Sequence, residues 1–201
     1  MAILGTPARA SDSLVTIFEL IAKTRRSVYS YLDDPVPRAV IDSAIMLAMV
    51  APNHHKTRPW RFFVYAGAGR APLVAAYEAA ARRLGRDVAK ARQRALVAPA
   101  MVVTACVPAT THAKAKVAEE EFATAAAIQN MLLALTCAGV STLITTGDLA
   151  ESDEVRKLIG LDALSGRVMA VVNVGYRSPE RPLSPRLEPD PAAYITWHES
   201  P

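Results

Sequence analysis

The sequence predicts a single domain in which helices and strands alternate. The chain has 201 residues, enough to bury one sizeable core. Segments with apolar residues at helical spacing are followed by short runs rich in β-branched and aromatic residues. Its content of 51% apolar and 21% charged residues is typical of soluble globular proteins.

Four helices and one strand are expected in the first half of the chain. The helical segments share apolar residues at i, i+3, i+4 and i+7 or a high alanine content, and cover residues 13–24, 37–48, 72–84 and 87–96. Pro37 suits the first position of the second helix. Residues 60–66 are dense in aromatic and β-branched side chains and predict a strand, with Trp60 as a core anchor.

Three strands, one long helix and one short helix are expected in the second half. The strands are the apolar runs at residues 100–107, 140–146 and 168–176. The long helix, residues 115–138, is apolar on much of its circumference in its second half, which suits a central helix or a dimer seam. Ser152 can cap the short helix, whose acidic start and basic end match the helix dipole.

The C-terminal region predicts an extended arm. Residues 178–191 contain five prolines, which prevents regular structure. Tyr194, Ile195 and Trp197 then supply an apolar anchor. We therefore expect a flexible N-terminus at residues 1–12, a folded domain at residues 13–176, and an arm at residues 177–201 that packs on a neighbouring subunit.

Composition argues against several classes of protein. There is no uncharged apolar run of about 18 residues to cross a membrane, and the start of the chain lacks the pattern of a signal peptide. The net charge of +4 is not accompanied by a nucleic-acid recognition motif. Cys106 and Cys137 lie in apolar surroundings and are expected to be buried thiols, so we expect a cytoplasmic protein without nucleic-acid or membrane partners.

A basic cluster lies within residues 82–94. It is either a solvated helical face or a surface that attracts an anionic cofactor or pyridine nucleotide. Residues 85–96 are also where we expect a lid or a substrate wall.

Two short segments carry most of the candidate chemistry. Pro52 and Pro59 frame a loop of polar side chains that suit an anion or a polar aromatic ligand, namely Asn53, His54, His55, Lys56, Thr57 and Arg58. A second basic segment, residues 25–27, follows the first helix. Arginine binds phosphate through bidentate, charge-assisted hydrogen bonds, so the two segments together suggest a phosphate-bearing cofactor.

Simpler interpretations of these segments stay open. The two arginines could cap the carbonyls at the end of the helix, and either histidine could be an ordinary surface residue. The histidine pair has no cysteine or carboxylate at ligand spacing nearby, so no metal site is expected.

The order and spacing of eight short motifs make this sequence similar to a known protein family. They are Arg25-Arg26-Ser27-Val28, Asp34-Pro35-Val36-Pro37, Ala51-Pro52-Asn53-His54, Arg58-Pro59-Trp60-Arg61-Phe62, Gly139-Val140-Ser141-Thr142, Thr146-Gly147, Val155-Arg156-Lys157-Leu158-Ile159-Gly160 and Val174-Gly175-Tyr176. Together they resemble the FMN-dependent nitroreductase family over nearly the whole chain. Pro52-x-His54 and Pro189-Asp190-Pro191 are most similar to its compact bacterial NAD(P)H nitroreductase subgroup.

The resemblance implies a fold, an assembly and a site. The fold would be α+β, a three-layer arrangement with a mostly antiparallel central sheet flanked by helices, in an intertwined homodimer with FMN at the subunit interface. The FMN-binding domain would be residues 13–176. Arg25, Arg26 and Ser27 match positions that hold the FMN phosphate and ribityl chain, Pro52, Asn53 and His54 match a segment from the other subunit, and Thr145, Thr146 and Gly147 match a segment that returns to the same flavin.

The chain also departs from the family pattern. Tyr29 stands where many members have arginine, Arg58 where glutamine is common, and Thr145 in a segment that can read Trp-Arg-Ser. Lys56, Arg58 or Arg186 are the candidates to replace the missing positive charge. We therefore count Tyr29, Lys56 and Arg58 among the expected cofactor-binding residues.

The resemblance implies an FMN-dependent NAD(P)H oxidoreductase. It would reduce nitroaromatics, quinones or similar small electron-poor oxidants by an alternating, ping-pong mechanism, with NADH or NADPH as electron donor. Flavin N5 carries the hydride, so no catalytic side chain is expected. The alternatives are a flavin-consuming or dehalogenating enzyme of the same fold, a non-catalytic flavin carrier or sensor, and a dimeric scaffold without FMN.

Overall fold

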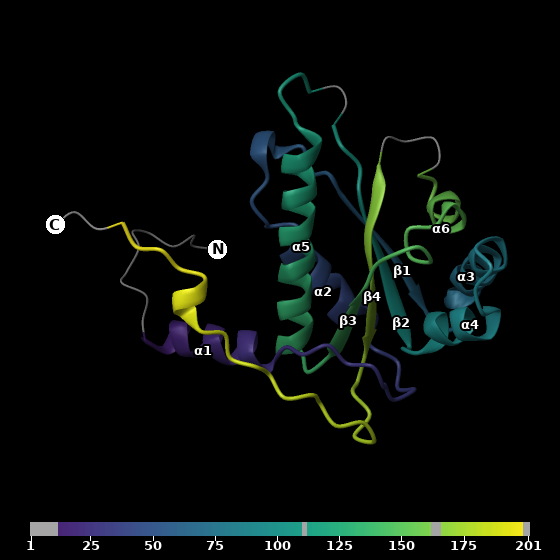
Figure 1. Ribbon diagram of the computed structural model, residues 1–201, viewed down its shortest axis with the longest axis horizontal. Coiled ribbons are helices and arrows are strands. Elements are labelled where there is room, and N and C mark those ends of the chain that lie inside the picture. Colours follow the sequence, from purple (N-terminus) through teal and green to yellow (C-terminus); the bar gives the residue numbers. More distant parts are fainter. Residues whose placement is uncertain (1–11, 110–111, 162–165, 199–201) are drawn as a thin grey trace.

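A single four-stranded sheet forms the middle layer of the fold (Figure 1). The computed structural model describes residues 12–109, 112–161 and 166–198. Its strands are β1 (Trp60–Ala66), β2 (Ala100–Cys106), β3 (Ser141–Thr145) and β4 (Arg167–Gly175). They are ordered β1-β2-β4-β3, and every neighbouring pair is antiparallel. The expected α+β fold with an antiparallel central sheet is confirmed.

The inner strand β2 is apolar along its whole length because both faces of the sheet are covered. All seven of its residues are buried. Successive side chains point to opposite faces of a strand, so Val102 joins one core cluster and Val103 the other. The strand predicted at residues 100–107 is therefore confirmed as an inner strand, one residue shorter at its end.

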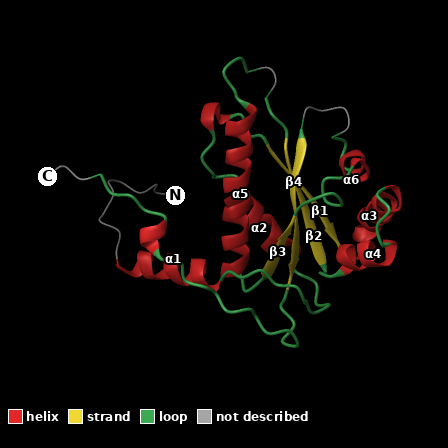
Figure 2. Cartoon of the chain, in the orientation of Figure 1, coloured by secondary structure: helices red, strands yellow, loops and turns green. Residues whose placement is uncertain are grey.

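Two helices cover one face of the sheet (Figure 2). They are α2 (Arg38–Ala48) and α5 (Val117–Cys137), which pack against each other. Helix α5 contacts all four strands, and the buried residues of α2 belong to the same core cluster. Trp60 is 5% exposed in the core cluster on this face, so its predicted role as a core anchor is confirmed.

Three helices cover the other face of the sheet, and they are α3 (Ala71–Arg83), α4 (Val88–Leu96) and α6 (Asp153–Leu158). Ser152 caps α6, as predicted, because its side chain accepts a hydrogen bond from the Val155 N–H. Helix α4 is anchored by buried Ala91 and Ala95, so residues 88–96 are a packed helix; their role as a lid or wall stays a prediction.

Helix α1 (Asp12–Thr24) and the C-terminal segment lie outside the three layers, beside the C-terminal end of α5 (Figure 1). The segment is extended, as predicted, and its described residues include the short 3-10 helix η3 (Pro191–Ala193). Phe18 of α1 is 61% exposed and Trp197 is 77% exposed. Packing of the arm on a second subunit stays a prediction, and the expected flexible N-terminus falls almost wholly outside the described residues.

One burial prediction is wrong. Cys106 is buried as expected, but Cys137 is exposed. Cys137 lies two positions after Leu135, which is about 200° around a helix of 3.6 residues per turn. It therefore points away from the buried stripe of α5, whatever the apolar character of its neighbours in the sequence.

Across the described ranges, no helix is both long enough and apolar enough to cross a membrane. The expected cytoplasmic location and the domain boundaries stay predictions.

Candidate functional site

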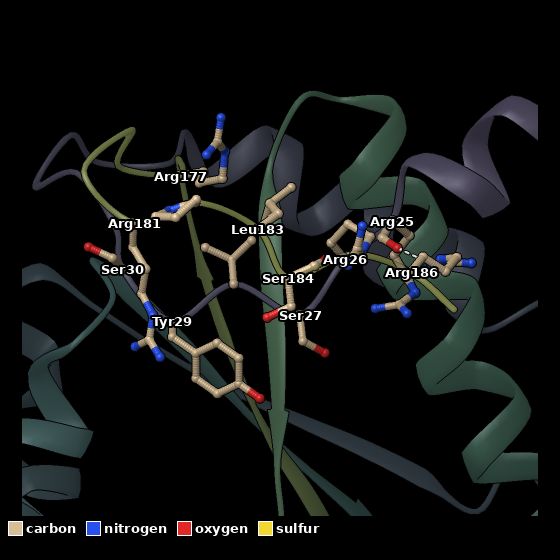
Figure 3. Close-up of a pocket in the computed structure, with 12 residues that line it drawn as sticks. Arg25, Arg26, Ser27, Tyr29, Ser30, Arg177, Arg181, Leu183, Ser184 and Arg186 are labelled. Atoms are coloured by element: carbon tan, nitrogen blue, oxygen red, sulfur yellow. Dashed lines mark hydrogen bonds between the residues drawn. The ribbon is translucent and has the colours of Figure 1, made fainter. Parts of the chain in front are cut away.

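A basic pocket lies between two segments that are far apart in the sequence (Figure 3). Its volume is about 330 Å³. Half of its lining comes from residues 25–30 and half from residues 177–186. Of the residues that the structure describes, five arginines line it and no acidic residue does; the arginines are Arg25, Arg26, Arg177, Arg181 and Arg186. We call this cavity the arginine pocket.

The backbone explains why the two segments meet. The chain that leaves α1 lies along the edge strand β3, where the Val28 N–H donates to the Thr142 carbonyl at 3.1 Å. The same stretch then pairs with the chain that leaves β4. Ser178 donates its N–H to the Ser30 carbonyl at 3.0 Å, and Tyr31 forms an antiparallel bridge with Arg177. The pocket is therefore built on the edge of the sheet.

Side chains tie the two walls of the pocket together. Arg26 donates a hydrogen bond to the Ser184 carbonyl, and Arg186 donates to the Arg25 carbonyl at 2.6 Å. Arg26 thus holds the C-terminal segment, which argues against the simpler interpretation that it caps α1.

The electrostatics of the pocket favour an anionic ligand. Desolvation, and then the nearby Arg186 and Arg26, lower the pKa of the Arg25 guanidinium. Clustered like charges repel one another, and a bound anion relieves that repulsion. Guanidinium groups beside the Ser27 and Ser184 hydroxyls are a donor set that fits a phosphate. The residues present therefore fit the phosphate end of FMN.

The segment Thr145-Thr146-Gly147 lies along the same sheet edge as the pocket. Ser27 pairs with Thr142 on β3, and Thr145 lies three residues further along that strand, about 10 Å at 3.3 Å per residue. Thr146 and Gly147 are exposed just beyond the strand. Gly147 has φ 91° and donates its N–H to Glu151 Oε1 at 3.0 Å. One chain thus aligns two of the three predicted flavin segments.

The third predicted segment, residues 52–58, lies far from the pocket within one chain. It contains the 3-10 helix η1 (His54–Lys56), where His55 packs its ring against His112 just before α5 begins. The arginine pocket lies near the other end of α5, where Arg25 and Thr136 line an adjoining cavity. A helix of 21 residues is about 30 Å long. Pro52, Asn53, His54, Lys56 and Arg58 therefore do not reach the pocket of their own chain.

The loop at residues 52–58 is strained and held in place by its own side chains. His55, Lys56 and Arg58 have φ of 60°, 54° and 54°. Such left-handed conformations are costly for residues other than glycine and gather at functional sites. Asn53 Oδ1 accepts a hydrogen bond from the Arg58 N–H at 2.6 Å, and the Asn53 side chain also pairs with Thr57. The loop therefore has a defined conformation, held by its internal hydrogen bonds.

Three imidazoles lie against one another at this loop, with their rings tilted. The ring centroids of His54 and His55 are 3.8 Å apart, and those of His55 and His112 are 4.3 Å apart. Desolvation, followed by His54 and His112, lowers the pKa of His55, which favours its neutral form. Among the described residues, no group of three or more histidine, cysteine or acidic side chains is placed to hold a metal ion.

Comparison with known proteins identifies the family. The model of the Nitroreductase family matches residues 22–176. This chain belongs to the nitroreductase family. The match runs from the end of α1 to just past the end of β4, so it includes the first wall of the arginine pocket, residues 25–30, and ends before the second wall, residues 177–186.

Individual relatives agree with that membership. This chain is 29% identical over 178 residues to YdjA of Escherichia coli (strain K12), which is provisionally named an NAD(P)H nitroreductase. The aligned region covers 86% of this chain and 94% of YdjA. Its fold matches a nitroreductase-like family protein from Bacillus cereus with a TM-score of 0.79 at 23% identity, over 99% of this chain and 100% of that one. It also matches the FMN-dependent nitroreductase NfnB from Mycobacterium smegmatis, crystallised with NADPH, with a TM-score of 0.71 at 18% identity. This match covers 92% of this chain and 100% of NfnB.

Two arginines that line the pocket of this nitroreductase, Arg177 and Arg181, are not predicted from the sequence. Arg186, which the sequence does suggest as a replacement for the missing positive charge, lines the pocket with them. Their signal in the sequence is the recurrence of arginine at intervals of four or five after the last strand.

Proposed function

We propose that this nitroreductase is an FMN-dependent oxidoreductase that takes electrons from NADH or NADPH. Its oxidants are small electron-poor organic compounds such as nitroaromatics or quinones. The observation that carries this proposal is the arginine pocket, where the described part of the chain gathers five guanidinium groups and no acidic lining residue. Such a site suits the phosphate dianion of FMN, and NfnB shows that the same fold works with FMN and NADPH.

The chain's own residues bind and orient the cofactor. Arg25, Arg26 and Ser27 hold the phosphate and the start of the ribityl chain. Thr145, Thr146 and Gly147 lie further along the same sheet edge and border the ring. Bound FMN supplies a ring that accepts a hydride and passes the electrons on. The protein positions that ring, tunes its charge and leaves one face open.

A second copy of the chain completes the site. Residues 52–58 cannot reach the pocket of their own chain, so Pro52, Asn53 and His54 serve the flavin of the partner subunit. Lys56 and Arg58 bring positive charge to the same region and stabilise negative charge on the reduced ring. The exposed apolar side chains of α1 and the C-terminal arm supply the contact surface; they include Leu14, Ile17, Phe18, Tyr194 and Trp197.

One open face of the flavin implies that donor and oxidant use the site in turn. The donor would give up its hydride and leave as NAD(P)+ before the oxidant enters, which is a ping-pong mechanism. Initial rates at several fixed oxidant concentrations should give parallel lines in double-reciprocal plots, whereas intersecting lines would contradict the alternating order.

Two measurements on the purified protein test the function. The visible spectrum should show flavin absorbance, and NADH or NADPH should be oxidised when menadione or nitrofurazone is added. Tight FMN without oxidation of either donor would favour the carrier or sensor. A colourless protein that takes up no added FMN would contradict the proposal.

A further inference from the structure

Tyr29 and Arg181 face each other at the arginine pocket (Figure 3). The Arg181 Cζ atom lies 5.0 Å from the centroid of the Tyr29 ring, within the range of a cation–π contact. Both residues line the pocket, one from each wall. Tyr29 is 54% exposed, so burial in a core does not explain its aromatic ring.

Arg181 is held by little besides this ring. It lies in the exposed stretch 179–186, which has no helix or strand. That stretch is fixed at one end by the Ser178–Ser30 backbone bond and at the other by Arg26 on the Ser184 carbonyl. Within the described ranges Arg181 forms no ion pair. An arginine side chain without an ion-pair partner samples many rotamers, and the contact with the Tyr29 ring restricts those of Arg181.

The contact with the ring keeps the arginine available to a ligand. A carboxylate partner would occupy the N–H donors of the guanidinium, whereas a cation–π contact attracts its positive charge without a carboxylate acceptor. A guanidinium held in this way beside the four other arginines of the pocket is preorganised for an oxyanion.

We propose that Tyr29 is a positioning residue that holds the Arg181 guanidinium at the pocket, where Arg181 binds the phosphate of the flavin. This proposal rests on the proposed function, because the phosphate is that of FMN. It assigns different roles to the two residues: Arg181 touches the ligand, and Tyr29 acts through Arg181.

Flavin binding with and without the phosphate tests the proposal. The dissociation constants of FMN and of riboflavin, which lacks the phosphate, are measured by flavin fluorescence for wild type and for variants. Arg181→Ala should weaken FMN about tenfold or more, the usual cost of a lost hydrogen bond to a charged group, and leave riboflavin unchanged. Tyr29→Leu should weaken FMN about two- to fivefold, as for an exposed cation–π contact.

Three further variants separate positioning from other roles. Tyr29→Phe keeps the ring and should bind FMN as wild type does. Tyr29→Leu added to Arg181→Ala should cause no further loss, because Tyr29 acts through Arg181. Arg82→Ala removes an exposed charge from α3, away from the pocket, and should leave both flavins unaffected.

Two results would overturn the proposal while leaving the proposed function standing. One is wild-type FMN affinity in Arg181→Ala. The other is an equal loss of FMN and riboflavin in Tyr29→Leu, which would indicate a structural role. A wild-type protein that binds no FMN would overturn both. Circular dichroism and thermal unfolding of each variant establish that the affinities compared belong to folded proteins.

Discussion

Gly147 lies at the end of β3 with φ 91°, a conformation that other residues rarely adopt. A Cβ atom added there would meet no heavy atom within 4 Å, so the cost of Gly147→Ala comes from the backbone. We expect the free energy of unfolding to fall by about 1 kcal/mol or more.

Gly69→Ala is the matched control for that prediction. Gly69 also has open space around it, and its φ is not in the left-handed region. Chemical denaturation should place this variant within about 0.5 kcal/mol of wild type. Equal losses at the two glycines would refute the backbone explanation.

His55 makes a prediction about pH at the same scale. Its pKa in the folded protein is lowered from 6.5 by desolvation, His54 and His112. The unfolded chain therefore binds more protons than the folded one between the lowered pKa and 6.5, so stability falls as the pH drops through that window. The melting temperature of His55→Asn, which tolerates a positive φ, should depend less on pH between about 5 and 7.

The control for His55 is His198→Asn, which removes an imidazole from the exposed arm. Its melting temperature should follow the wild-type pH dependence. An identical pH dependence in the His55 variant and the wild type would contradict the explanation that the lowered pKa of His55 makes stability depend on pH.

At the scale of elements, Arg83 joins α3 to α6 through ion pairs with Glu154 and Asp153, of which the pair with Glu154 is the shorter. Arg83 donates to both carboxylate oxygens of Glu154, at 2.8 and 2.9 Å. This hydrogen bonding lowers the pKa of Glu154 to about 2. A carboxyl with a depressed pKa contributes stability above its ordinary value of 4.5, and that contribution is lost as the pH falls toward 2.

The pair is partly exposed, with 46% of the Arg83 side chain accessible, so its contribution is small. Arg83→Ala should lose a small amount of stability at pH 7 and approach wild-type stability near pH 2. Arg82→Ala, whose partner Glu78 lies on the same helix, should lose less. A loss for Arg83→Ala that is the same at pH 7 and pH 2 would exclude the ion pair as its cause.

Elements with a local signal were predicted well from the sequence. The strand at residues 60–66 coincides with β1, because aromatic and β-branched residues crowd that stretch and glycines end it. The long helix is shorter than predicted by two residues at its start and one at its end, since helix ends depend on local contacts.

Features that depend on distant contacts were not predicted. Residues 25–30 meet residues 177–186 through backbone pairs between positions separated by about three quarters of the chain. The sequence near Arg177 and Arg181 therefore does not identify them as pocket residues. Tyr29 was noted as a departure from the family pattern, but its contact with Arg181 exists only in the folded chain. Burial of Cys137 was predicted wrongly because the helical phase, and not the composition around it, decides which side faces the core.

At the scale of the whole molecule, α1 and the arm project apolar side chains that a single chain leaves exposed, such as Phe18 and Trp197. Deleting residues 177–201 removes this arm together with Arg177, Arg181 and Arg186. We expect a monomeric or insoluble protein without FMN, measured by size-exclusion chromatography and the visible spectrum. A dimer that still carries FMN would refute the role of the arm.

A shorter deletion separates the two contributions of the arm. Removing residues 187–201 keeps the arginines that line the pocket and loses the apolar end. This protein should bind FMN more tightly than the longer deletion does, while dimerising less than the full chain. Equal FMN affinity in the two truncated proteins would show that the arginines after β4 do not bind the phosphate.

The mass of the native protein tests the central claim most directly. That claim is that two copies of the chain hold FMN between the arginine pocket of one and residues 52–58 of the other. Native mass spectrometry of the protein as purified, or after addition of FMN, should show a species of two chains with two FMN molecules. A single chain without flavin under both conditions would contradict the account.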